Sequence, residues 1–94
     1  MSHIIATNVV ILRRKQVEAH TGNSRSTLYL RIAQGLWPRP VKVGPRAVGW
    51  PASEVAAINA ARIAGKSDGD IRRLVTKLEA ERQSAVGAIE GRPS

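Results

Sequence analysis

The amino-acid sequence predicts a mainly α-helical fold with a small β-hairpin, arranged as a winged helix-turn-helix with a C-terminal helical extension. Two short helical segments meet at a turn around Gly22, and two short β-favouring runs follow between prolines. A longer amphipathic segment comes after them. We therefore expect a flexible N-terminus over residues 1–8, the winged domain over 9–65, a C-terminal helix over 66–86 and a disordered tail over 87–94.

The first predicted helix runs from Lys15 to His20 and follows an apolar, β-favouring run at residues 9–12. Val17 is its expected inward anchor. Gly22 suits the left-handed position that ends a helix, because glycine has no Cβ to clash there. The pattern therefore predicts a short helix followed by a sharp turn.

The second predicted helix begins after Ser24, which is a good N-cap, and is closed by Gly35. An apolar stripe recurs every four residues and is expected to pack on the first helix: Leu28, Ile32 and Leu36. The opposite face is expected to present the polar residues Thr27, Arg31 and Gln34, with Leu30 at its edge.

A helix cannot continue through Pro38 and Pro40, because both remove a backbone donor and favour extended geometry before them. Two alternating runs follow, at residues 41–43 and 47–50, and predict a β-hairpin. A hairpin directly after a helix-turn-helix is typical of a wing. The rings of two tryptophans are expected between the wing and the helices, with stacking on bases as the alternative: Trp37 and Trp50.

Two further helices are predicted, at residues 51–64 and from Ser67 to about Ala85. In the first, Val55, Ile58 and Ile63 are expected to face inward. The acids of both helices, Glu54 among them, are expected on helix surfaces. The second helix carries an apolar stripe made by Ile71, Leu74, Val75 and Leu78. This stripe has two interpretations, packing on the protein's own core or formation of a homo-oligomer.

The chain carries a formal net charge of +8, most of it in the first half. Residues 1–50 hold eight Lys/Arg against one acid, a charge of +7, and residues 51–94 hold seven against six, a charge of +1. Such a basic field attracts polyanions, so we expect double-stranded DNA as the partner.

Composition also predicts what the chain lacks. It has no cysteine, no apolar run of membrane-spanning length and no signal-peptide pattern, so we expect a soluble, cytoplasmic, nucleoid-associated protein with no membrane partner. Two histidines are too few for a zinc site, and no phosphate loop or nucleophile–base pairing occurs. We expect no cofactor and no enzymatic activity.

A helix that enters the major groove needs short or basic side chains near its N-terminus, because bulky ones hold it away from the base edges. The second helix begins with such residues. Arg13, Arg14 and Lys15 lie at the start of the first helix and oppose its dipole, which suggests that they bind phosphate. The candidate DNA-binding residues are Arg14, Lys15, Ser24, Arg25, Ser26, Thr27, Tyr29, Arg31, Lys42 and Arg46. Structural alternatives are a pure helix cap for Ser24, a core position for Tyr29 and a solvated turn for Arg46.

Several motifs between Leu12 and Ile58 resemble the AlpA family of phage and prophage transcriptional regulators. They are L-R-R-K-x-V-E, T-G-x-S-R-S-T-L-Y, G-L-W-P-x-P-V-K-V-G, and V-G-W followed by S-E-V. The resemblance implies a MerR-like or excisionase-like winged helix-turn-helix that binds DNA. The sequence departs from the family in having Ile58 where tryptophan is frequent, and in its helix from Ser67 onward.

The leading interpretation is a sequence-specific, double-stranded DNA-binding regulator of integrase or excision genes, with residues 24–31 reading the groove. One alternative is an excisionase, a recombination directionality factor that bends DNA over repeated sites. Another is a protein-interaction or antitoxin-like adaptor, in which the stripe of the last helix is the functional surface.

Overall fold

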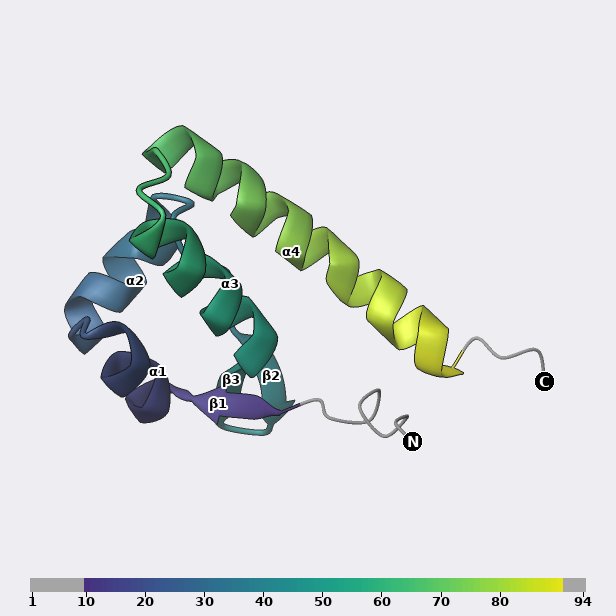
Figure 1. Ribbon diagram of the computed structural model, residues 1–94. Helices are drawn as coiled ribbons and strands as arrows, with labels where there is room; N and C mark the ends of the chain where they lie inside the picture. Colours follow the sequence, from purple (N-terminus) through teal and green to yellow (C-terminus); the bar gives the residue numbers. More distant parts are fainter. Residues whose placement is uncertain (1–9, 91–94) are drawn as a thin grey trace, which may run out of the picture.

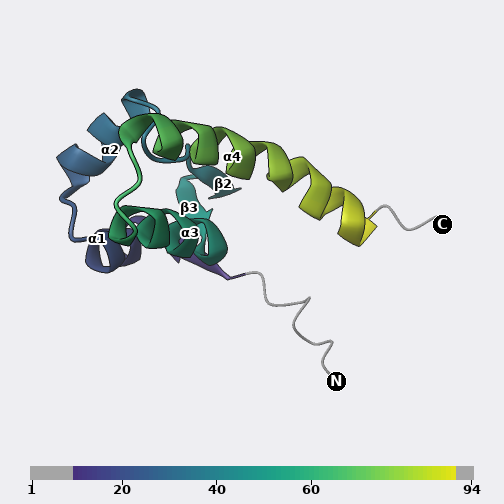
Figure 2. The same ribbon diagram turned by 45° about the horizontal axis from the view of Figure 1, so that its top comes forward.

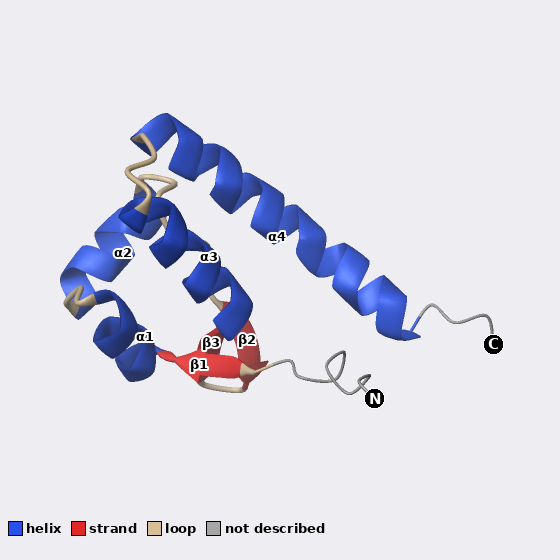
Figure 3. Ribbon diagram, viewed as in Figure 1, coloured by secondary structure: helices blue, strands red, loops and turns tan. Residues whose placement is uncertain are grey.

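The computed structural model describes residues 10–90, with side chains described as far as Gln83. Along this part of the chain the elements are β1 (Ile11–Arg13), α1 (Arg14–Thr21), α2 (Arg25–Ala33), β2 (Val41–Gly44), β3 (Ala47–Pro51), α3 (Ala52–Ile63) and α4 (Asp68–Glu90) (Figure 1). The predicted class, mainly helical with a small sheet and a C-terminal helix, is confirmed (Figure 3).

The structure tests the expected boundary at the C-terminal end of the chain but not the one at the N-terminal end. The expected flexible N-terminus over 1–8 lies outside the described residues, as do the last four residues of the expected tail. α4 continues to Glu90, past the end expected near Ala85, so residues 87–90 are helical.

The wing hairpin of β2 and β3 is joined by β1 to form a three-stranded antiparallel sheet in the order β1-β3-β2. Leu12 pairs with Trp50, and Arg13 pairs with Gly49. β1 overlaps the β-favouring run expected at residues 9–12, but nothing in the sequence indicated which strand this run pairs with. Because β1 leads directly into α1, this pairing places the start of α1 beside the wing (Figure 1).

Gly49 allows β1 to lie this close to β3. A Cβ at this position would overlap the Ile11 Cγ2 atom and lie 2.8 Å from the Leu12 carbonyl oxygen. We expect Gly49→Ala to lower the free energy of unfolding by about 2 kcal/mol, because the backbone of β1 must shift. Urea denaturation measures this loss. Gly44→Ala is the matched control, since its Cβ meets only Ala47 Cβ at 3.6 Å. Equal losses in the two variants would contradict a steric role for Gly49.

The core draws residues from every element except β2: Leu12, Val17, Leu28, Leu36, Trp37, Trp50, Val55, Ile58, Ile71 and Val75. Trp50 is fully buried, and its Nε1 donates a hydrogen bond to the Pro38 carbonyl at 2.7 Å. Trp37 is buried too, which confirms the expected core positions of both tryptophans. The expectation for Ile63 is wrong: it lies in the last turn of α3 and is 87% exposed.

The apolar stripe of α4 packs on the protein's own core. Ile71 and Val75 are buried, while Leu74 and Leu78 are partly buried against the same cluster. α3 contacts α1 as well as α4, and α4 lies on the far side of the fold from α1 (Figure 2). Of the two interpretations of the stripe, the structure supports packing within one chain, since Ile71 and Val75 are already covered.

Glu54 corrects the expectation that the acids of the C-terminal half lie on helix surfaces. It is in the first turn of α3, as expected, but it is 4% exposed because α4 passes over it. Arg82 of α4 binds its carboxylate with two hydrogen bonds, from Nε at 2.8 Å and from Nη2 at 2.7 Å. These bonds raise the pKa of Arg82 above its usual range, so the guanidinium keeps its positive charge.

Candidate nucleic-acid interface

The exposed face of α2 is the first part of the candidate interface. Arg25, Ser26, Tyr29 and Leu30 are exposed, whereas Leu28 on the opposite face is fully buried. Positions 25 and 29, and likewise 26 and 30, are one helical turn apart, so the four side chains form one strip. We call these four residues the reading strip. Tyr29 is 39% and Leu30 56% exposed, so the alternative of a core position for Tyr29 is not observed.

Ser24 is committed to capping α2. Its Oγ accepts a hydrogen bond from the Thr27 backbone N–H at 3.2 Å and donates one to Thr27 Oγ1 at 3.1 Å. Thr27 is half-buried, so it is less exposed than its expected place on the polar face of α2 implied. The reason is the cap itself, which turns the Thr27 hydroxyl toward Ser24. The cap leaves the other N–H groups of the first turn available to an anion.

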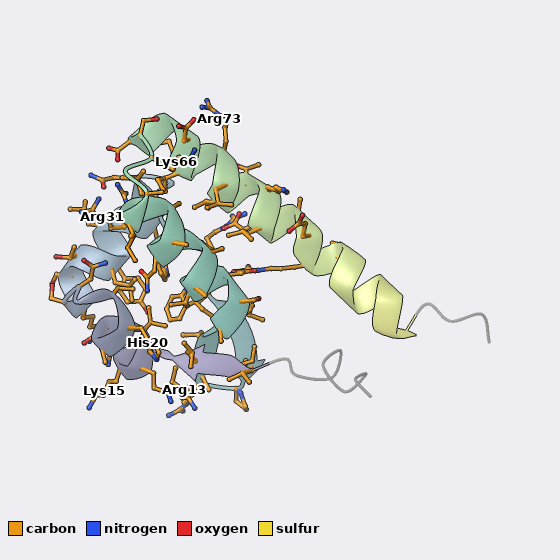
Figure 4. The ribbon with its side chains drawn as sticks, in the orientation of Figure 1. Arg13, Lys15, His20, Arg31, Lys66 and Arg73 are labelled. Atoms are coloured by element: carbon orange, nitrogen blue, oxygen red, sulfur yellow. The ribbon has the colours of Figure 1, made fainter. Side chains whose placement is uncertain are left out.

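Arg31 also lies away from the reading strip, which corrects its expected position on the exposed face. It is half-buried and lines a pocket of about 220 Å³ together with Thr21, Asn23, Asn59 and Arg62. The pocket lies between α3 and the turn that joins α1 to α2. Figure 4 shows Arg31 on α2, well separated from Arg13 and Lys15. A role for Arg31 in base contact is therefore not favoured by its placement.

A basic notch forms the second part of the candidate interface. It has a volume of about 350 Å³ and is lined by Arg13, Arg14, Lys15, Arg46 and Val48. The pairing of β1 with β3 creates it, since the start of α1 is held against the wing. Figure 4 shows Arg13 and Lys15 pointing out from the fold at this end. Residues 31 positions apart in sequence, such as Lys15 and Arg46, thus contribute to one surface.

The three arginines and the lysine of the notch are not equivalent. Arg14 is half-buried and forms an ion pair with Glu18, one turn further along α1. Glu18 is the only acid among residues 1–50. Within the described part of the chain, Arg13, Lys15 and Arg46 form no ion pair. Their charges are therefore available to an external anion, and Arg13 is better placed than Arg14 to bind a phosphate.

The wing supplies two exposed cations. Arg46 follows Pro45 in the turn between β2 and β3, and Lys42 lies on β2 opposite Val48. Lys42 lies outside the notch, so it extends the basic surface along the outer strand. The structure thus brings Lys15 and Arg46 together and leaves Lys42 apart from them.

Together these surfaces offer a strip of short, basic and apolar side chains on α2 and separate cationic groups on α1 and the wing. Cations bind phosphates, and the strip has the side-chain types that contact base edges and methyl groups. Among the side chains that the structure describes, those of residues 10–83, no group of three is suited to metal binding. None of the helices described there combines the length and hydropathy needed to span a bilayer.

Comparison with known proteins identifies the family. Residues 10–62 match the family model described as prophage CP4-57 regulatory protein (AlpA). The chain is also 45% identical over 58 residues to the uncharacterized protein ORF88 of Enterobacteria phage P4. That match covers 62% of this chain and 66% of the phage protein, slightly less than two thirds of its length. No solved structure matches significantly. The family model covers more than half of the chain, and the protein belongs to the AlpA family of phage regulatory proteins.

Proposed function

We propose that this protein is a sequence-specific, double-stranded DNA-binding regulator of the phage and prophage type. The reading strip of α2 enters the major groove, where Arg25 and Ser26 contact base edges at the start of the helix. Arg13, Lys15 and Arg46 bind backbone phosphates beside it, and Lys42 extends these contacts along the wing. The protein acts inside the cell at the nucleoid, without a cofactor and without catalysing a reaction.

The observation that carries this proposal is the exposure of the reading strip. Tyr29 and Leu30 stay partly exposed in a chain that buries Leu28, Trp37 and Trp50. Two neighbouring apolar groups on a strip that also carries Arg25 and Ser26 suit contact with base methyl groups in the groove. The cations of the notch support the same partner, because phosphate contacts fix the register of a helix in the groove.

Selection of bound sequences from a random pool of duplexes tests the proposal. We expect one short sequence to be enriched, and footprinting to show protection centred on it. A single protected site at a promoter supports a regulator of transcription, while cooperative protection of tandem sites with bending supports the excisionase alternative. Recovery of no common sequence would contradict specific recognition.

Arg13 and Arg14 provide a matched pair for testing the notch. We expect Arg13→Ala to reduce the magnitude of the slope of log K against log [salt] by about 0.9, the value for one phosphate contact. Arg14→Ala should change it less, because Glu18 already neutralises Arg14. Fluorescence anisotropy on a random-sequence duplex at several salt concentrations measures both. A larger change for Arg14→Ala would argue against the assignment of Arg13 to a phosphate.

A further inference from the structure

The linker between α2 and β2 depends on α4 for its backbone hydrogen bonds. Pro38 and Pro40 have no N–H group, so Arg39 is the only backbone donor between them. The Arg39 N–H donates to Glu79 Oε2 at 2.8 Å. The Arg39 carbonyl accepts from Arg82 Nη2, also at 2.8 Å. Both backbone groups of this residue are therefore bound by side chains of α4.

α4 also binds the linker near Gln34, and Glu54 of α3 in turn binds Arg82 of α4. Arg72 Nε donates to the Gln34 carbonyl at 2.9 Å, just after the end of α2. Arg82 is oriented by its two bonds to the buried Glu54 of α3. The linker joins α2, the proposed recognition helix, to the wing, and side chains of α4 form hydrogen bonds with it at Gln34 and at Arg39. The α4 residues that make these contacts lie about 40 residues after the linker in sequence. They are outside residues 10–62, which match the family model.

We infer that Glu79 and Arg82 are positioning residues of the DNA interface, which set the wing relative to the reading strip. The inference rests on the proposed function. β2 begins two residues after Arg39, so a linker that moves at Arg39 moves the wing. Two surfaces that must contact one duplex together bind better when their spacing is fixed beforehand, because less conformational entropy is lost. α4 therefore contributes to DNA binding although it lies on the other side of the fold from α1.

Substitution of Glu79 tests the inference, because loss of its negative charge and loss of its bond to the linker are expected to change DNA affinity in opposite directions. Removing an acid from a protein that binds a polyanion should strengthen binding through electrostatics alone. Removing the acceptor for the Arg39 N–H should weaken binding to a specific site if the linker must be held. Glu81 is the matched control: it lies on the same helix, is exposed, and is not among the residues that bind the linker.

The experiment compares Glu79→Ala, Glu79→Gln and Glu81→Ala on a duplex recovered by selection and on a shuffled duplex of equal length. We expect Glu79→Ala to bind the selected duplex about fivefold more weakly than the unmodified protein, while its affinity for the shuffled duplex is unchanged or higher. Glu79→Gln should retain affinity, because its amide oxygen still accepts from the Arg39 N–H. Glu81→Ala should bind both duplexes at least as tightly as the unmodified protein.

The inference is overturned if Glu79→Ala binds the selected duplex as tightly as Glu81→Ala does. Arg82→Lys covers the case in which Glu79→Ala does not fold. Lysine keeps a positive charge beside Glu54. Its single ammonium cannot reproduce the geometry in which the Arg82 guanidinium donates to the Glu54 carboxylate and to the Arg39 carbonyl at once. It should lose specific affinity by a similar factor, and unchanged affinity would also overturn the inference. If the unmodified protein binds no duplex at all, the proposed function itself fails.

Discussion

Arg82→Ala is expected to lower the free energy of unfolding by about 3 kcal/mol, because it leaves the buried Glu54 carboxylate without a partner. The Glu54 side chain is 6% and the Arg82 side chain 24% exposed, so water cannot replace the lost guanidinium without opening the contact between α3 and α4. The variant also loses the bond to the Arg39 carbonyl. Urea denaturation followed by circular dichroism measures the change.

Two controls separate the buried pair from a general effect of α4. In the double variant Glu54→Leu with Arg82→Leu no charge is left buried, so it should be more stable than Arg82→Ala alone. Arg73→Ala removes another arginine from α4, which pairs with Asp70 on the surface of the same helix. Its effect on stability should be small. A loss in Arg82→Ala no greater than in Arg73→Ala would show that the Glu54 pair does not hold α4 in place.

Arg25→Ala is expected to weaken binding to the selected duplex by about 1–3 kcal/mol and to relax the base preference at one position of the site. Arg25 is exposed at the start of α2, where a guanidinium can donate two hydrogen bonds to a guanine. Competition binding with single-base variants of the duplex measures both effects. Binding to shuffled duplexes should fall much less.

Lys66→Ala is the matched control for Arg25. It removes one positive charge from the turn between α3 and α4, where Lys66 is exposed and distant from α1 in Figure 4. If charge alone mattered, the two variants would lose the same affinity on selected and shuffled duplexes. If Arg25→Ala and Lys66→Ala lost the same affinity for the selected duplex, base contact by Arg25 would be contradicted.

Local signals were enough to predict the helix-turn-helix. Gly22 adopts the left-handed conformation expected of it, with φ of 76°, and Ser24 caps α2 as its side chain suggests. Val17 and Leu28 are fully buried, as their spacing indicated. Each of these features depends on contacts within a few residues, which is why a single sequence reveals them.

Tertiary contacts account for what the sequence did not reveal. Arg13 belongs to the notch because β1 pairs with β3, and nothing local to Arg13 specifies that partner. Glu54 has the pattern of an ordinary acid in the first turn of a helix, and only the passage of α4 buries it. The same reason applies to the two faces of α2: Arg31 lines a pocket with residues of α3 and of the turn before α2, whereas Tyr29 stays 39% exposed.

Amide chemical shifts, recorded while the protein is titrated with the selected duplex, show which surface of the protein contacts the DNA. We expect the largest changes at residues 24–30 and at Arg13, Lys15 and Arg46. Smaller changes are expected at Arg39, and none of comparable size along the exposed face of α4. Changes concentrated on α4, or at the pocket around Arg31, with α2 unaffected, would contradict the assignment of the reading strip as the surface that recognises DNA.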